Sequence, residues 1–291
     1  MTIDLAPFVE RMRPKGLLSV IVERDGEREQ FFSEPDIRRN LYSASKSYTS
    51  VAVGIAVGEG LLSLDEKLTE AFRDRLPAKP DENLQKATVR DLLTMCLGQK
   101  EACLMGADRG SIPTEDWARY ALSRPFDCAP GEKFVYNNAG PYLAGLLVQE
   151  RAGEDLIGYL TPRFFKPLGI RRTVWEVDPL GNTFGAGGLF LSHGEFHKLG
   201  QLWLNEGRWE GRQVLDPAWV RESSRKQVEN GLDGYGYLIW RGRGDSYMAQ
   251  GKYCQLCAVY PEKNAVISVM AECRDEMEMH RALYKELVPQ L

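Results

Sequence analysis

The sequence predicts an α/β (α+β) protein, with an antiparallel sheet that is built from both ends of the chain, flanked by helices and interrupted by a mostly helical lobe. Three observations predict this class. Strand-like segments occur near both ends, helical patterns broken by Pro and Gly fill the middle, and 291 residues suffice for two lobes. We expect a sheet lobe of residues 1–60 and 185–291 and a helical lobe of residues 61–184, which together form one unit.

The first two strands are expected to form a hairpin. Residues 17–23 and 28–32 are rich in apolar and aromatic side chains, and Asp25-Gly26 between them is typical of a tight two-residue turn. A second group of strands is expected near the other end of the chain. These strands are 235–241, 247–259 and 265–271.

A buried helix is expected over residues 43–60, because this segment is apolar on nearly every side. Gly54 and Gly58 would let neighbouring elements pack closely against it, at a cost in helix propensity. Amphipathic patterns and Pro or Gly breaks delimit the remaining helices. They are expected at 88–97, 114–123, 140–151, 154–164, 194–206 and 275–288.

Composition and charge exclude several classes of protein. Apolar residues make up 43% and charged residues 27%, as in ordinary globular proteins. The net charge of −4 gives no general reason to expect a nucleic-acid partner. No apolar run approaches the roughly 18 residues of a membrane helix, so we expect no membrane partner. The start of the chain lacks the pattern of a secretory signal, which predicts a cytoplasmic protein with reduced cysteines. Neither a metal nor an organic cofactor is expected.

Ser43-Ala44-Ser45-Lys46 is the first candidate for catalysis. If a helix begins at Ser43, the side chains of Ser43 and Lys46 share one helix face, with Cβ atoms about 5–6 Å apart. A serine hydroxyl is a weak nucleophile until a nearby base takes its proton, and the Lys46 amine is within reach. A helix start also presents free N–H groups that stabilise an oxyanion. The same pattern is compatible with an ordinary helix N-cap.

A second Ser-x-x-Lys sequence runs from Ser223 to Lys226. It lies in a charged, polar stretch and has no buried helix behind it. We therefore interpret it as solvated surface.

Tyr136-Asn137-Asn138, after the turn Pro130-Gly131, is the second candidate. A tyrosine acts as a base when a nearby cation lowers its pKa from about 10, and Lys46 is the expected source. Burial lowers the pKa of a lysine as well, so the two groups would titrate as a pair, and the sequence assigns the proton to neither. Asn138 offers an amide that can orient Lys46 and a substrate carbonyl. The alternative is a tyrosine and an amide that cap a loop.

Taken together, these motifs resemble the serine β-lactamase and penicillin-binding-protein superfamily. The similarity is greatest to its class C β-lactamase-like serine hydrolases, which include esterases, D-aminopeptidases and amide-oligomer hydrolases. That resemblance implies a β-lactamase/transpeptidase-like fold with the active site between the lobes. Further matching segments are Leu61 to Asp65, Thr88 to Met95, Pro130 to Phe134, Gly187 to Leu189 and Leu215 to Val220.

The third motif of the superfamily is Lys or His, any residue, then Gly, and the matching stretch here is Ala249-Gln250-Gly251-Lys252. The resemblance implies that the N–H of Lys252 pairs with the N–H of Ser43 as an oxyanion hole. Ala249 occupies the position of the cation that binds a ligand carboxylate in relatives. We therefore expect a neutral ester or amide to be favoured over an anionic β-lactam, unless the Lys252 side chain points inward.

The resulting prediction is a serine hydrolase that forms an acyl-enzyme on Ser43, with an ester, an amide or a β-lactam as small-molecule substrate. A non-hydrolytic penicillin-binding or sensor module is the first alternative. Aromatic side chains that could line the substrate pocket, although such residues more often belong to the core, are Trp117, Phe134, Tyr235, Tyr237 and Trp240.

A zinc-dependent hydrolase is the second alternative. His193-Gly194-Glu195 and the pair Cys254 and Cys257 faintly resemble a zinc-deaminase pattern, and His193 and His197 are spaced to chelate on a helix. Against it, the two cysteines are expected on opposite faces of a strand. The histidines are more simply explained as polar residues of a surface helix.

Overall fold

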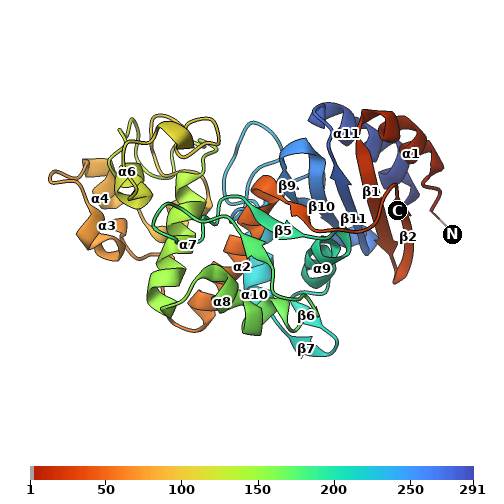
Figure 1. The fold of residues 1–291 in the computed structure, drawn as a ribbon, viewed down its shortest axis with the longest axis horizontal. Coiled ribbons are helices and arrows are strands. Elements are labelled where there is room, and N and C mark those ends of the chain that lie inside the picture. Colours follow the sequence, from red (N-terminus) through yellow and green to blue (C-terminus); the bar gives the residue numbers. More distant parts are fainter. Residues whose placement is uncertain (1–2) are drawn as a thin grey trace.

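The main sheet joins the two ends of the chain. In the computed structural model, which describes residues 3–291, six antiparallel strands follow the order β2-β1-β11-β10-β9-β8. Figure 1 shows β1 and β2, in red, beside the blue strand β11. The predicted sheet from both termini is therefore confirmed. Its strands are β1 (Leu17–Arg24), β2 (Glu27–Phe32), β8 (Trp240–Arg241), β9 (Tyr247–Gly251), β10 (Gln255–Tyr260) and β11 (Ala265–Ala271).

The β1–β2 hairpin turns at the predicted position. Asp25 has φ 52° and Gly26 has φ 81°, and two successive left-handed residues match the right-handed twist of the flanking strands. The register pairs Arg24 with Glu27 directly across this turn.

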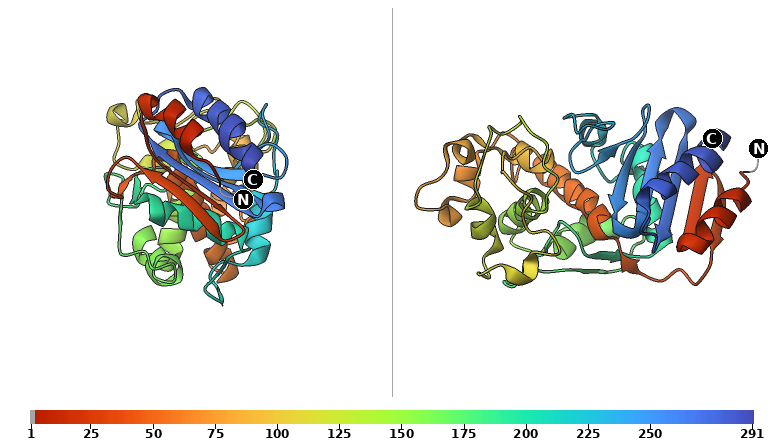
Figure 2. Two further views of the ribbon diagram at one scale, coloured as in Figure 1. Left: turned by 90° about the vertical axis from the view of Figure 1, so that its right-hand side faces the viewer. Right: turned by 90° about the horizontal axis from the view of Figure 1, so that it is seen from above.

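Helices cover both faces of the sheet (Figure 2). On one face, α1 (Ala6–Met12) and α11 (Glu276–Ala282) share an apolar cluster with the alternate side chains of β11, including Ile267 and Val269. On the other face, α9 (His193–Leu204) packs against β10 and β11. The sheet thus has a core on each side.

The chain between α2 and α9 forms mostly short helices and irregular segments. The predicted helix 88–97 ends at Leu93, and Met95 takes a left-handed φ of 61°. Between Leu93 and Trp117 the chain is largely irregular, so the helical content predicted for this region was too high. The helices are α3 (Leu68–Ala71), α4 (Glu82–Lys86), α5 (Val89–Leu93), α6 (Trp117–Leu122), α7 (Ala139–Ala152) and α8 (Leu156–Leu160).

Helix α2 (Ser45–Gly58) runs through the middle of the molecule and contacts both α7 and β9 (Figure 1). Every residue from Ser45 to Gly54 is buried, which confirms the prediction of a buried helix. A 3₁₀ turn, Tyr42–Ala44, precedes α2, so the α-helix begins at Ser45 rather than at Ser43. Hence α2 connects the helical lobe to the sheet.

The two glycines of α2 have different surroundings. A Cβ atom at Gly54 would lie 2.4 Å from the indole of Trp219, so only glycine lets α10 (Pro217–Ser224) approach this closely. At Gly58 a Cβ atom would meet nothing within 4 Å. Close packing was therefore predicted correctly for Gly54 and wrongly for Gly58.

This contrast predicts opposite effects of one substitution at two positions in the same helix. Gly54→Ala is expected to lower the free energy of unfolding by about 1–3 kcal/mol, because the added methyl overpacks the Trp219 contact. Gly58→Ala is expected to raise it by roughly 0.5–1 kcal/mol through helix propensity. Urea unfolding of both variants measures the two changes, and equal signs would contradict the packing described.

Two predicted strands differ from the observed ones. Only Trp240–Arg241 of the predicted strand 235–241 pairs with β9. The predicted strand 247–259 is two strands, because Tyr253 and Cys254 take left-handed φ values of 61° and 67° and reverse the chain. The break follows directly after Gly251.

Two smaller sheets complete the fold. One contains β3 (Arg39–Asn40), β5 (Leu189–Leu191) and β4 (Val174–Trp175), and the other contains β6 (Arg208–Trp209) and β7 (Arg212–Gln213). Across residues 3–291, no helix combines the length and apolar character needed to cross a bilayer.

Candidate active site

The turn before α2 holds Ser43 beside Lys46. Asn40 Oδ1 accepts a hydrogen bond from the N–H of Tyr42 at 2.7 Å, and Tyr42 has a left-handed φ of 48°. Ser43 remains partly exposed at the end of this turn, and its Oγ lies 3.0 Å from Lys46 Nζ. The structure thus brings together the hydroxyl and the amine, although the α-helix starts two residues later than expected.

Lys46 is enclosed by hydrogen-bond acceptors. Its side chain is 1% exposed, and Nζ donates to Asn138 Oδ1 at 2.7 Å and to the carbonyl of Ala186 at 2.6 Å. Burial, together with the positive charge of Arg109, lowers the pKa of Lys46 to about 7. Near neutral pH a substantial share of Lys46 is therefore an uncharged amine.

Tyr136 lies on the other side of the hydroxyl. The nitrogen of Lys46 is 5.1 Å from the centre of its ring. Removal of water around the phenol raises the pKa of Tyr136 to about 12, and the nearby Ser43 hydroxyl opposes this rise only in part. The expectation that Lys46 lowers the pKa of Tyr136 is wrong, because burial raises this pKa and Lys46, whose own pKa is lowered by burial, does not counteract it.

Asn138 is the residue that fixes Lys46 from the helical lobe. It precedes α7, and its N–H donates to the carbonyl of Cys103 at 3.1 Å. Its Nδ2 donates to the carbonyl of Leu104 at 3.0 Å, which directs Oδ1 towards Lys46. One amide hydrogen remains for a ligand.

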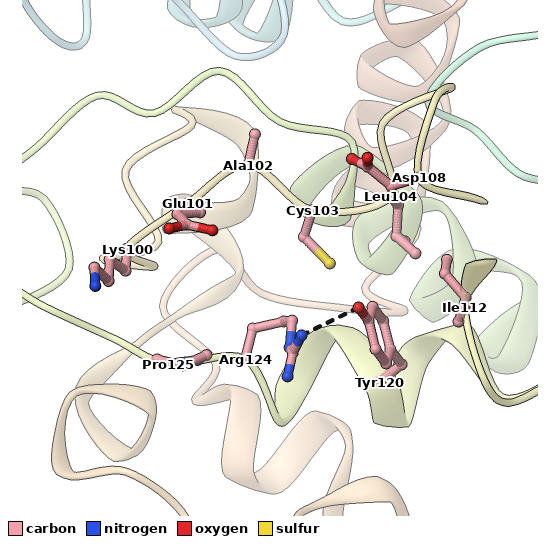
Figure 3. A pocket seen from close by; sticks show the side chains of 10 residues that line it. All are labelled: Lys100, Glu101, Ala102, Cys103, Leu104, Asp108, Ile112, Tyr120, Arg124 and Pro125. Atoms are coloured by element: carbon pink, nitrogen blue, oxygen red, sulfur yellow. Dashed lines mark hydrogen bonds between the residues drawn. The ribbon is translucent and has the colours of Figure 1, made fainter. Parts of the chain in front are cut away.

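A cavity of about 380 Å³ lies against the same turn, 103–104 (Figure 3). Arg124 and Tyr120 form one side of it, and Arg124 donates to the Tyr120 hydroxyl at 3.1 Å. Ser43, Lys46, Tyr136 and Asn138 are not among its lining residues. It is therefore separate from the candidate active site.

Strand β9 brings Gly251 against the turn that carries Ser43. A Cβ atom at Gly251 would lie 2.1 Å from the carbonyl oxygen of Leu41 and 3.0 Å from the nitrogen of Ala44. Only glycine permits this approach. Lys252 follows at once, is exposed, and holds its ammonium 4.9 Å from the ring centre of Tyr253.

Ala249 is buried on β9, opposite Cys257, so this strand carries no cation at the position that corresponds to the Lys or His of the expected third motif. A charged pair instead lies at another border of the site, where Arg109 Nη1 and Glu176 Oε2 are 3.2 Å apart. Arg109 also stacks at 4.7 Å on Phe184, two residues before Ala186. Sequence reasoning missed Arg109, since no motif marks a single arginine in an irregular segment.

The predicted aromatic residues divide into core and site. Trp117, Tyr235 and Tyr237 are buried core residues. Trp240 and Phe134 are partly buried, and the ring centre of Trp240 lies 5.2 Å from that of Tyr136. Trp240 is therefore a side wall of the candidate site.

The structure does not bring together the histidines and cysteines proposed for the alternative zinc site. His193 and His197 are buried, not on a surface as expected, and both rings hydrogen-bond to the hydroxyl of Ser268. Cys254 and Cys257 belong to apolar clusters on opposite faces of the sheet, as predicted. Within residues 3–291, no three His, Cys, Asp or Glu side chains are grouped to hold a metal.

In the second Ser-x-x-Lys sequence, Ser223 is buried, whereas the sequence predicted solvated surface. Ser223 is 1% exposed and donates to the carbonyl of Val220 within α10. The prediction failed because it counted the neighbouring charges but not the apolar face of this helix. Lys226, in contrast, is exposed as expected and pairs with Glu229 at 2.7 Å.

Comparisons with known proteins identify the family and the fold. The family model described as Beta-lactamase matches residues 19–288. A Bacillus anthracis protein provisionally named as a 6-aminohexanoate-dimer hydrolase superposes with a TM-score of 0.80 at 17% identity, over 97% of this chain and 80% of that one. The octameric penicillin-binding protein homologue from Pyrococcus abyssi superposes with a TM-score of 0.76 at 19% identity, over 98% and 79%.

Among curated relatives, a D-aminopeptidase from Brucella anthropi is 29% identical over 143 residues, which are 47% of this chain and 26% of that protein. Another relative, an uncharacterised protein from Alkalihalophilus pseudofirmus, is matched over 53% of its length. The chain thus spans between a quarter and about half of the curated relatives it matches.

Proposed function

Because the chain belongs to the beta-lactamase family, we propose that it is a serine hydrolase that cleaves an ester or amide through an acyl-enzyme on Ser43. One observation carries the proposal. A buried lysine with a pKa of about 7 lies 3.0 Å from a partly exposed serine hydroxyl. This pairing supplies a nucleophile and a base at neutral pH.

Lys46 takes the proton of Ser43 in the first step. The neutral amine has two hydrogens and one lone pair, and Asn138 Oδ1 and the Ala186 carbonyl accept the two hydrogens. The lone pair is then left to face Ser43 Oγ. As the proton moves to Lys46, the serine oxygen bonds to the substrate carbonyl carbon.

Tyr136 supplies the proton for the leaving group. Its pKa of about 12 keeps it a neutral phenol at pH 7, so it acts as an acid. When the bond to the leaving alcohol or amine breaks, the phenol gives that group its proton and recovers one from Lys46. Water then attacks the acyl carbon and gives one proton to Lys46. As the bond between the acyl carbon and Ser43 Oγ breaks, Lys46 returns this proton to Ser43, and the free acid leaves.

The backbone N–H groups of Ser43 and Lys252 are the proposed oxyanion donors. The close contact of Gly251 with Leu41 and Ala44 supports this role, because it brings the end of β9 to the turn that carries Ser43. A lost donor of this kind typically lowers the rate by about 10²–10³.

A neutral ester or amide is the substrate class that we favour. The absence of a cation at Ala249 on β9 removes a partner for the carboxylate of a β-lactam. The names of two similar proteins, a D-aminopeptidase and a 6-aminohexanoate-dimer hydrolase, also indicate amide substrates for those proteins.

A fluorophosphonate probe with intact-mass detection tests the proposal. We expect one adduct on the wild type, none on Ser43→Ala, and an unchanged adduct on Ser223→Ala, the serine of the second Ser-x-x-Lys sequence. Turnover is then measured on p-nitrophenyl esters, nitrocefin, and D-alanyl and ω-amino-acid amides. A stable penicillin adduct without turnover of any of them would favour a non-hydrolytic penicillin-binding module, and an adduct on Ser43→Ala would contradict the proposal.

The pH profile provides a separate prediction. For a neutral ester, kcat/KM is expected to rise with pH through about 7 and then level, because the base acts after Lys46 loses its proton. Arg109→Gln removes a positive charge near Lys46, so its pKa rises and the midpoint moves to higher pH. Arg119→Gln, an exposed arginine paired with Asp116, should leave the midpoint in place. A midpoint that Arg109→Gln leaves unchanged would contradict the assignment.

A further inference from the structure

The cavity of about 380 Å³ beside the turn 103–104 is lined by an arginine that has no anionic partner. Arg124 is partly buried, and within residues 3–291 its one hydrogen bond goes to the Tyr120 hydroxyl. Its Nε is enclosed and has no acceptor. The other partly buried arginines of this range all bond to a carboxylate or a backbone carbonyl. Since a guanidinium has five N–H donors, most donors of Arg124 are free.

Tyr120 holds this guanidinium in place. The guanidinium carbon of Arg124 lies 4.6 Å from the centre of the Tyr120 ring, and Nη1 donates to the Tyr120 hydroxyl at 3.1 Å. The hydroxyl hydrogen of Tyr120 has no acceptor of its own among residues 3–291. Figure 3 shows both side chains on one wall, with the sulfur of Cys103 pointing towards them. This wall therefore presents N–H and O–H donors in a fixed arrangement.

The neighbouring groups do not neutralise the charge of Arg124. Burial raises the pKa of the Cys103 thiol to about 11, and the charge of Arg124 opposes this rise only in part, so the thiol is neutral at pH 7. The acids of the lining, Glu101 and Asp108, are exposed, and neither forms an ion pair with Arg124. Lys100, which is exposed as well, adds a second positive charge. Solvent screens these exposed charges more than that of the partly buried Arg124.

The remaining lining of the cavity is apolar, and the space is small. Its volume lies near the lower end of the roughly 300–1,000 Å³ that is usual for small-molecule sites. A guanidinium pairs preferentially with a carboxylate, through charge-assisted hydrogen bonds. These features fit a carboxylate that is attached to a compact apolar body. The apolar lining residues are Ala102, Leu104, Ile112 and Pro125.

We propose that this cavity binds a small organic carboxylate, whose charged group is held by Arg124 and Tyr120 and whose apolar part packs against the apolar lining. Ser43 and Lys46 do not line the cavity, so the site is distinct from the candidate active site. Binding of the carboxylate does not depend on the proposed hydrolase function.

The turn 103–104 connects this cavity to the candidate active site. The carbonyls of Cys103 and Leu104 accept hydrogen bonds from Asn138 at 3.1 and 3.0 Å. Asn138 in turn accepts a bond from Lys46 at 2.7 Å. Leu104 has a left-handed φ of 59°, which is uncommon for a residue other than glycine. A ligand that packs against Leu104 therefore acts on the residue that positions Lys46, and we expect it to change kcat. This link rests on the proposed function.

Titration calorimetry with benzoate as the probe tests the site directly. We expect saturable binding of benzoate by the wild type and weaker binding of its neutral isostere benzamide. Arg124→Gln should weaken benzoate binding by about tenfold or more, as loss of a hydrogen bond to a charged group does. Tyr120→Phe should weaken it by a smaller factor. Arg119→Gln, an exposed arginine of α6 outside the lining, is the matched control and should bind as the wild type does.

Several results would overturn the site. They are an absence of benzoate binding, equal binding of benzamide, and an affinity for benzoate that a folded Arg124→Gln variant retains. Tighter binding of inorganic phosphate than of benzoate would also overturn it, in favour of an inorganic anion.

Kinetics with p-nitrophenyl acetate test the link to Asn138. Saturating benzoate should change kcat of the wild type but not of Arg124→Gln. An unchanged kcat would overturn the link, and a rise in KM alone that Arg124→Gln retains would place benzoate at Ser43 instead. If no ester is hydrolysed, the proposed function fails, whereas calorimetry still decides whether the cavity binds a carboxylate.

Discussion

Lys46→Met is expected to lower turnover of a neutral ester by about 10²–10⁴, the range for loss of a proton-transfer group. The substitution removes the amine that lies 3.0 Å from Ser43 Oγ while it keeps a long, unbranched side chain in the buried space. It also leaves Asn138 Oδ1 and the Ala186 carbonyl without their donor. Steady-state kinetics over a range of pH measure the loss, and the rise through pH 7 should vanish with it.

Lys67→Met provides the matched control. Lys67 also donates to a backbone carbonyl, that of Lys86 at 2.7 Å, but it lies away from Ser43 and is exposed. This variant should retain wild-type turnover, which separates loss of the base from loss of any lysine. Turnover of Lys46→Met within a few-fold of the wild type would show that Lys46 is not the base.

Gly251→Ala is expected to have the second-largest effect, a loss of about 10²–10³ in kcat, the range for one missing oxyanion donor. The new methyl would lie 2.1 Å from the Leu41 carbonyl oxygen, a distance that backbone atoms cannot tolerate. Strand β9 must therefore move away from the turn that carries Ser43, and the N–H of Lys252 moves with it. KM should change less than kcat, because the lost interaction forms with the transition state.

Gly58→Ala is the control for Gly251→Ala, since its methyl meets no atom within 4 Å. Thermal unfolding of both variants shows whether the fold survives. If Gly251→Ala is folded and retains its kcat, the end of β9 does not supply an oxyanion donor.

Much of the framework could be predicted from the sequence because local patterns determine it. The Asp25-Gly26 turn, the strand 265–271 and the buried helix after Ser43 all follow from residue type and hydrophobic periodicity. The pairing of Ser43 with Lys46 follows from their spacing across one turn, even though the α-helix starts at Ser45.

The remaining features of the fold and of the candidate site depend on contacts between distant segments or on backbone conformation, which residue patterns do not determine. No sequence pattern indicated that Tyr253 would take a left-handed conformation and split a strand, or that the carbonyl of Ala186 would hold Lys46. The pKa of Tyr136 was expected to fall and instead rises, because the amount of protein around a phenol is a property of the assembled fold. The same holds for the buried position of His193.

The proposed catalytic groups lie on different parts of the molecule, and this has a mechanical consequence. Ser43 and Lys46 lie within one turn at the start of α2, so they move as a rigid body. Tyr136 belongs to the segment before α7, and Gly251 belongs to the sheet. A displacement of the segment before α7 from α2 would therefore affect both proposed proton transfers, because Tyr136 donates to the leaving group and Asn138, two residues later, holds the Lys46 amine.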